Sequence, residues 1–234
     1  MMSPQNNAFE KVKELAKDLQ LPLKHWELYQ LAFTHQSYAN EHHENSNERL
    51  EYLGDAILDF LVADFLYHRF PDLPEGQLTK IRAKYVCANA NSKYASALKL
   101  DHYLLLGKGE LEQGGKSKPS VLADLFEAFL GALYLDLGIE VVRKILDKFV
   151  FSQIESEDPG FFVDYKSRLQ EFVQAESREG VRYVLQEASG LAHDKTFRFA
   201  VFHENLRLGV GVGKSKKEAQ QNAAKDALEK LAIN

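Results

Sequence analysis

Two short stretches of the sequence place acidic side chains at helical spacing on faces that otherwise read as apolar. The first contains Glu48, Glu51 and Asp55. At about 100° per residue these acids lie within about 60° of one another on a helix. The same stripe continues to Leu58 and Val62, so it becomes core one turn later. Carboxylates beside a core are costly unless something neutralises them.

The second stretch holds Asp124 and Glu127, three residues apart in a segment dominated by Leu, Phe and Ala. Gly54 and Gly131 stand close to the two acid pairs and permit a neighbouring backbone to approach. Both segments are expected to form largely buried helices, and acids at this spacing on two such helices suggest one shared cation site. Carboxylates without His or Cys suit Mg²⁺ or Mn²⁺.

The same spacing is equally compatible with solvated surface acids and with acids paired to basic side chains. Arg49 points to a different side of its helix and is a poor partner. The histidines show no metal-ligand spacing, and Cys87 is interpreted as a small core residue. Neither a Gly-rich phosphate loop nor a Ser-His-Asp arrangement is found, so no organic cofactor or side-chain nucleophile is expected.

The composition excludes several classes of protein. The 234 residues are 45% hydrophobic and 27% charged, which excludes a disordered chain, a collagen and a mucin-like stalk. One cysteine excludes an intramolecular disulfide. We see no signal peptide at the N-terminus, and the most apolar segment, residues 120–137, carries three acids, so no membrane span is expected. The reducing cytoplasm is the expected compartment.

The net charge of −5 argues against a nucleic-acid binder when the chain is taken whole. The average hides an asymmetry, because residues 161–234 carry a net charge of +2 and residues 1–160 a net charge of −7. The acidic excess is therefore confined to the first two-thirds of the chain.

A polar segment ending in Pro159-Gly160 predicts a boundary between two domains. We expect an all-α domain over 1–154, a linker over 155–160 and an α+β domain over 161–234. In the first domain, apolar spacing of three and four predicts helices over 9–19, 28–33, 47–70, 78–98 and 121–151. A turn is expected at 74–76 and a mobile basic loop over 107–119.

The α+β domain is expected to have the order α-β-β-β-α, with both helices on one face of the sheet. A helix is predicted over 164–176, with Leu169, Phe172 and Val173 facing inward. Alternating apolar residues then predict three strands, and a final helix follows over 215–231. The apolar residues of the strands are Val181, Tyr183 and Leu185, then Phe197, Phe199 and Val201, then Leu206, Leu208, Val210 and Val212.

The start of the final helix carries an unusual run of lysines. Ser215 and Glu218 fit a capping box, yet Lys216 and Lys217 lie in the first turn, where the helix dipole disfavours cations. With Lys214 they form a phosphate-binding candidate. The alternative is that all three lysines are simply solvated.

Two further groups of side chains in this domain are candidates for contact with RNA. Gln170 and Gln174 lie one turn apart, and neutral amides suit the wide, shallow minor groove of an RNA duplex. Solvated glutamines are the commoner case. The loop over 190–195, with His193 and Lys195, offers a third contact point, and together these points could span successive grooves of an A-form duplex.

Beyond these separate signals, the chain resembles bacterial ribonuclease III from about Phe9 to Leu231. The segment Asn47–Ala56, NERLEYLGDA, is similar to the signature of the family nearly residue for residue. Leu31–Asn40 resembles the preceding helix of the family, and Gly114–Tyr134 resembles its second acidic motif. The C-terminal part resembles a double-stranded-RNA-binding domain.

The resemblance implies an endonuclease that cuts double-stranded RNA and leaves 5′-phosphate and 3′-hydroxyl ends with short 3′ overhangs. It implies Mg²⁺, for which Mn²⁺ substitutes, held by Glu51, Asp55, Asp124 and Glu127. Asp55 and Glu127 would be the catalytic core, with Glu48 near the site. It also implies processing of ribosomal RNA precursors and of some messenger RNAs.

The resemblance further implies a homodimer with one catalytic valley, in which Tyr52 replaces the frequent Phe that enters a socket on the partner. Leu191 departs from the frequent Gly-Pro of the RNA-contacting loop, and Gln77 stands where many members carry an acid. Two rival functions are a non-catalytic duplex-RNA binder, which would lack at least one of the four acids, and a DNA-binding protein, which the glutamine and loop pattern fits less well.

Overall fold

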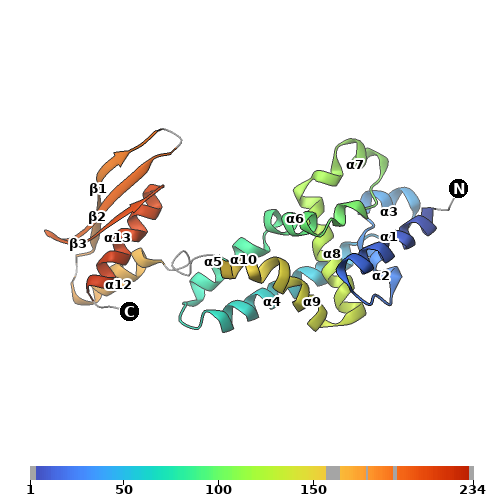
Figure 1. The fold of residues 1–234 in the computed structure, drawn as a ribbon, viewed down its shortest axis with the longest axis horizontal. Helices are drawn as coiled ribbons and strands as arrows, with labels where there is room; N and C mark the ends of the chain where they lie inside the picture. The colour runs from blue at the N-terminus through green and yellow to red at the C-terminus, as the bar shows by residue number, and fades with distance from the viewer. Residues whose placement is uncertain (1–3, 157–163, 178, 192–193, 232–234) are drawn as a thin grey trace. The chain divides into compact units, whose positions relative to one another are not determined.

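A computed structural model describes residues 4–156, 164–177, 179–191 and 194–231 (Figure 1). The chain divides into two compact units, Met1–Phe161 and Phe162–Asn234. Most of the expected linker and the expected contact residue His193 lie outside the described residues.

The first unit is all helical, as predicted. Its α-helices are α1 (Pro4–Leu19), α2 (Trp26–Ala32), α3 (Gln36–His42), α4 (Glu48–Arg69), α5 (Glu75–Val86), α6 (Ala88–Ala97), α7 (Lys108–Glu112), α8 (Pro119–Leu137), α9 (Ile139–Leu146) and α10 (Ser152–Ser156). Short 3₁₀ helices η1 (Leu100–His102) and η2 (Gly115–Ser117) and a π-helical turn η3 (Asp147–Phe151) complete it.

Helix α8 forms the centre of this unit (Figure 1). It is apolar nearly all round, and side chains such as Leu125, Phe126 and Phe129 are fully buried. A helix of this kind must be covered on most sides, and α2, α4, α6 and α9 pack against it. The central position of α8 places Asp124 and Glu127 inside the unit rather than on a peripheral helix.

Several predicted boundaries were wrong. The stretch 78–98 is two helices, because Cys87 has an extended backbone and separates α5 from α6. Cys87 is also exposed, so its interpretation as a core residue was wrong. The stretch 121–151 is interrupted at Gly138, whose φ of 84° is a left-handed value that favours glycine. Helix α1 begins at Pro4, five residues before the expected start.

The predicted turn at 74–76 and the predicted loop at 107–119 were also wrong. Pro74 precedes α5, and Glu75 and Gly76 form its first turn. In the other segment the chain forms α7 and η2. The backbone N–H of Lys108 donates to Glu41 of α3 (2.8 Å), a tertiary contact that sequence periodicity does not reveal, and within the segment Lys118 pairs with Glu110 (2.7 Å).

The second unit has the predicted order: α12 (Tyr165–Glu176), β1 (Val181–Ser189), β2 (Thr196–His203), β3 (Leu206–Gly213) and α13 (Lys216–Lys230). The sheet is antiparallel in the order β1-β2-β3. Leu169 and Val173 of α12 are buried, as expected, with Phe199, Val201 and the alanines of α13.

In the third strand, the glycines rather than Val210 and Val212 face α13. Paired residues lie on the same face of a sheet, and Phe199 pairs with Gly211 while Ala200 pairs with Val210. The glycines of β3 therefore face α13, where an added Cβ at Gly211 would overlap the backbone of Ala223. Because α13 approaches this face of the sheet closely, there is no room on it for the side chains of Val210 and Val212.

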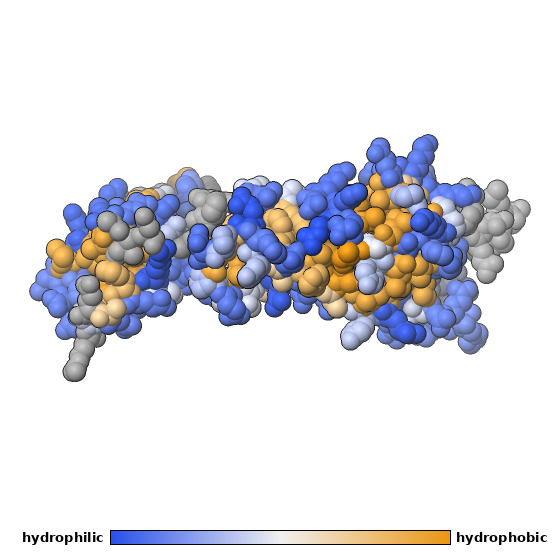
Figure 2. Space-filling view, turned by 90° about the horizontal axis from the view of Figure 1, so that it is seen from below, coloured by the Kyte–Doolittle hydropathy of each residue, from blue (hydrophilic) through white to orange (hydrophobic). Residues whose placement is uncertain are grey.

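None of the helices in the described ranges combines the length and the apolar character needed to cross a membrane. Apolar side chains do reach the surface of the first unit, and Figure 2 shows them among hydrophilic ones in the view from below. On α4 the large exposed apolar residues are Tyr52, Phe60 and Tyr67.

Candidate active site

The two acid-bearing helices, α4 and α8, cross in backbone contact at two glycines. A Cβ added to Gly54 would overlap the carbonyl oxygen of Glu127, and one added to Gly131 would overlap the carbonyl oxygen of Leu50. The close approach expected from these glycines is confirmed. It brings the acids of both helices to one place.

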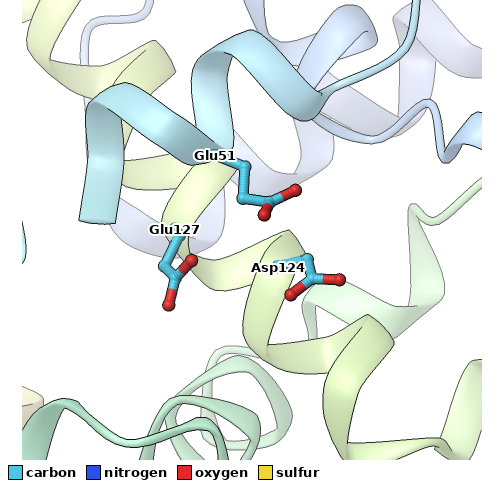
Figure 3. Close-up of side chains that lie close together, drawn as sticks. All are labelled: Glu51, Asp124 and Glu127. Carbon is cyan, nitrogen blue, oxygen red and sulfur yellow. The ribbon is translucent and has the colours of Figure 1, made fainter. Parts of the chain in front are cut away.

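Three carboxylates meet at this crossing (Figure 3). Glu51 comes from α4, and Asp124 and Glu127 come from α8; each offers an oxygen within 4.8 Å of the others. All three are half-buried. The distances suit ligands arranged around one hard cation, which binds carboxylate oxygens at about 2.0–2.6 Å.

The other two predicted acids lie at the edge of this group. Asp55 is exposed and is outside the three-carboxylate cluster, although its charge raises the pKa of Glu127. Glu48 is exposed and accepts hydrogen bonds from Ser46 Oγ (2.6 Å) and Gln36 Nε2 (3.2 Å). Asn47 precedes α4, and its side chain donates to the carbonyl of Ala32 (3.2 Å) rather than capping the helix.

The pKa values show that ionising these acids together is unfavourable. Burial, followed by the charges of neighbouring acids, raises the pKa of Glu127 to about 7 and that of Glu51 to about 6. Burial also raises the pKa of Asp124 and of Asp55. Like charges in a partly dry site disfavour one another, and an added cation would relieve them.

In the described part of the chain, no lysine or arginine contributes to the pKa shift of Glu51, Asp124 or Glu127. The basic group that acts on the cluster is His35, whose charge lowers the pKa of Asp124 against the larger effect of burial. Pairing with basic side chains, which the sequence left open, therefore does not account for these three acids. Their oxygen-only donor set, half-buried at one crossing, fits a divalent cation such as Mg²⁺ or Mn²⁺.

One further member of the site, Asn91, carried no signal in the sequence. It lies on α6, and its Nδ2 donates to Oε1 of Glu127 (2.7 Å). Its side chain is fully buried. In the sequence, Asn91 is only one polar residue in a helix of mainly small side chains. That pattern does not indicate that its side chain contacts Glu127.

In the second unit, the start of α13 has the Ser215 half of the predicted capping box, whereas the Glu218 carboxylate bonds to the residue before the cap and not to the cap itself. Ser215 Oγ accepts from the N–H of Glu218 (3.1 Å), and the Glu218 carboxylate accepts from the N–H of Lys214 (2.8 Å). Lys216 and Lys217 are exposed in the first turn. Lys214 forms an ion pair with Asp194 (2.7 Å), which brings the β1–β2 loop beside the helix start.

The two residues of α12 that are predicted to contact RNA differ in their exposure. Gln174 is exposed, whereas Gln170 is partly buried and its Oε1 accepts from the N–H of Val181 (3.2 Å). Lys195, in the β1–β2 loop, is exposed. The side-chain oxygen of Gln170 is thus occupied by a hydrogen bond to the start of β1.

Comparison with known proteins agrees with both units. A model of Ribonuclease-III-like domains matches residues 25–154, and one of the double-stranded RNA binding motif matches residues 165–231. Ribonuclease 3 of Geobacillus thermodenitrificans is 47% identical over 225 residues, covering 94% of this chain and 91% of that protein. The chain belongs to the ribonuclease III family. Ribonuclease 3 of Bacillus licheniformis is 44% identical over 225 residues, covering 95% and 90%.

Solved structures place the first unit in the same family. The ribonuclease III nuclease domain of Campylobacter jejuni is 36% identical, with a TM-score of 0.57, and the match covers 63% of this chain and 98% of that one. A second structure of that domain, with a TM-score of 0.56 and 37% identity over 60% and 96% of the two chains, is described as flexible in a region involved in dimer formation. The chain is therefore a ribonuclease III-type endoribonuclease that acts on double-stranded RNA.

Proposed function

We propose that this enzyme hydrolyses double-stranded RNA with Mg²⁺ held by Glu51, Asp124 and Glu127, and with Asp55 completing the ligand set. Mn²⁺ would substitute. The observation that carries the proposal is the meeting of three half-buried carboxylates from α4 and α8 at one crossing.

The roles of the side chains follow from charge. The carboxylates alone would repel a phosphodiester, and in ionised form they hold the cation that reverses this field. When bound, the ion supplies an activated water and offsets charge on the leaving 3′ oxygen. Asp55 and Glu127 are proposed as the catalytic core, with Glu48 supporting the edge of the site. The products would be 5′-phosphate and 3′-hydroxyl ends with short 3′ overhangs.

The second unit is proposed to hold the duplex through three elements. Lys214, Lys216 and Lys217 present positive charge to phosphates at the start of α13, where backbone N–H groups also favour anions. Gln170 and Gln174 of α12 would contact a minor groove. The β1–β2 loop adds His193 and Lys195. The Lys214–Asp194 ion pair supports a joint surface formed by this loop and α13.

A homodimer formed through α4 is the proposed assembly. Tyr52, Phe60 and Tyr67 are 81%, 60% and 69% exposed, and they lie within about 80° of one another around the helix. Exposed aromatic residues on one face are typical of interfaces. A cavity of about 340 Å³, lined by Phe60 and Tyr67 and by Leu78 and Arg82 of α5 among others, provides room for a partner's side chain.

Ribosomal RNA precursors and some messenger RNAs are the proposed substrates, because folded transcripts supply long duplex segments. The cytoplasm, where such transcripts are made in bacteria, is the proposed compartment.

One cleavage assay tests these proposals against the two rival functions. Duplex RNA, duplex DNA and single strands are incubated with the full chain, with and without Mg²⁺, and the RNA ends are mapped. We expect cleavage of duplex RNA alone, only with Mg²⁺ or Mn²⁺, with 5′-phosphates. Binding without cleavage would favour a non-catalytic binder, and preference for DNA would favour the second rival.

A further inference from the structure

Asn91 connects two helices at the edge of the acidic cluster. Its Nδ2 donates to Oε1 of Glu127 on α8 (2.7 Å) and to the carbonyl oxygen of Val86 at the end of α5 (3.2 Å). Its side chain is 0% exposed. The amide thus touches one of the three clustered carboxylates from inside the protein.

The orientation of this amide is decided by its neighbours. A backbone carbonyl and a carboxylate are both acceptors, so the side-chain nitrogen, not the oxygen, must face them. The oxygen, Oδ1, is then turned elsewhere, and it is buried with no hydrogen-bond partner among the described residues. Such an orphaned acceptor costs about 1–3 kcal/mol.

Packing alone does not explain an amide at this position. Leucine has nearly the same side-chain length and would avoid the orphaned acceptor. It would also suit α6, whose neighbouring buried residues include Tyr94 and Ala95. A leucine would lose both donor contacts, the one to the carbonyl of Val86 and the one to Glu127. Of these two, only the contact with Glu127 reaches the acidic cluster.

That contact limits the motion of a flexible side chain. Free glutamate samples several rotamers, and holding one costs conformational entropy. With Oε1 bonded to Asn91, the Glu127 carboxylate stays close to Glu51 and Asp124. A neutral donor achieves this without the positive charge of lysine, which would compete with a cation for the cluster.

We propose that Asn91 is a positioning residue of the divalent-cation site, and that it raises the affinity for the cation by holding the carboxylate of Glu127 toward Glu51 and Asp124. This inference rests on the proposed metal-dependent function. Partners of this kind behind a metal ligand typically change metal affinity by about 10–100-fold when removed.

The test measures Mn²⁺ binding to the full chain without RNA, by electron paramagnetic resonance of the free ion. Asn91→Leu removes both the donor and the orphaned acceptor, and Asn91→Ser leaves a hydroxyl too short to reach Glu127. We expect the dissociation constant for Mn²⁺ to rise about tenfold or more in both variants. The thermal midpoint of metal-free Asn91→Leu should be unchanged or higher, which a purely structural role would not produce.

Ser92→Ala is the matched control, because Ser92 is also buried on α6 but its hydroxyl donates to the carbonyl of Asn89 (3.0 Å). It should leave Mn²⁺ affinity unchanged. Cleavage of duplex RNA gives a second readout, in which the half-saturating Mg²⁺ concentration should rise for the Asn91 variants in proportion to the weaker binding.

The outcomes separate this inference from the function on which it rests. If the unsubstituted chain binds Mn²⁺ and both Asn91 variants bind it equally well, the positioning role is wrong and the function stands. Equal weakening by Ser92→Ala would also overturn it, because general loosening of α6 would then be the cause. If the unsubstituted chain binds no Mn²⁺, both proposals fail. Should Asn91→Leu not fold, Asn91→Ser decides.

Discussion

Gly54 lies directly against the backbone of Glu127, so closely that any side chain at position 54 would overlap the carbonyl oxygen of residue 127. The same relationship recurs one turn away, where Gly131 lies against the backbone of Leu50. These two contacts set the separation of α4 and α8. The distance between Glu51 and the acids of α8 depends on them.

Replacement of Gly54 should therefore affect both stability and the site. Gly54→Ala forces the two helices apart, and we expect a loss of about 1–3 kcal/mol in the free energy of unfolding, together with weaker Mn²⁺ binding. Chemical denaturation and Mn²⁺ titration measure the two effects. Gly76→Ala is the control, because no atom lies within 4 Å of a Cβ added there. Equal stability of the two variants would contradict the role of the crossing.

Replacement of Glu127 should separate cleavage from binding. Glu127→Gln keeps the shape of the side chain and removes a proposed ligand charge, so cleavage should be abolished while duplex-RNA affinity stays nearly unchanged. End-labelled cleavage and gel-shift assays measure these. Glu140→Gln, at an exposed position on α9, is the control. Cleavage by Glu127→Gln at the unsubstituted rate in saturating Mg²⁺ would remove this residue from the site.

The stability of the metal-free protein should depend on pH in a definite direction. Burial, then neighbouring charges, raises the pKa of Glu127 from 4.5 to about 7 and that of Glu51 from 4.5 to about 6. The folded state therefore holds extra protons between pH 4.5 and about 7. The contribution of these acids to stability is fully present below pH 4.5 and is lost as the pH rises through this window.

Denaturant unfolding at several pH values, in a chelating buffer, measures this trend. Saturating Mg²⁺ should offset the loss at neutral pH, because a cation stabilises the ionised carboxylates. Glu127→Gln should flatten the metal-free profile in its upper part, toward pH 7. A variant profile identical to that of the unsubstituted chain would show that Glu127 does not titrate in this range.

The lysines at the start of α13 should control the salt dependence of RNA binding. Each phosphate contact that is lost reduces the slope of log affinity against log salt concentration by about 1, so the double change Lys216→Ala and Lys217→Ala should reduce it by about 2 at most. Lys230→Ala is the control, because Lys230 lies at the other end of α13 and pairs with Asp226 (2.6 Å). An unaltered slope in the double variant would exclude phosphate contact at this helix start.

Tyr52 should be needed for the proposed dimer. An exposed aromatic ring that becomes buried between subunits contributes strongly to association, so Tyr52→Ser should shift the protein toward monomer and lower its specific cleavage rate. Sedimentation velocity at several protein concentrations measures the shift. Tyr52→Phe keeps the ring and should remain dimeric. A monomeric unsubstituted chain would rule out the assembly itself.

Much of the fold follows from patterns along the chain. The helical spacing of apolar residues predicted α4, and alternation predicted three strands. The boundaries that were missed depend on contacts between distant segments. Helix α7, for example, is anchored by Glu41, which lies in α3. No local pattern around residues 107–119 contains that information.

The sequence by itself determined that the acids of α4 and α8 would lie on helical faces beside small residues, because the helical period and glycine's missing side chain are local properties. Only the tertiary structure decided which atoms meet. It placed Asn91 against Glu127, and it turned the glycines of β3, rather than its valines, toward α13. The first outcome depends on the packing of α6 against α8, and the second on how closely α13 approaches the sheet. Both join segments that are distant along the chain, so no local pattern encodes them.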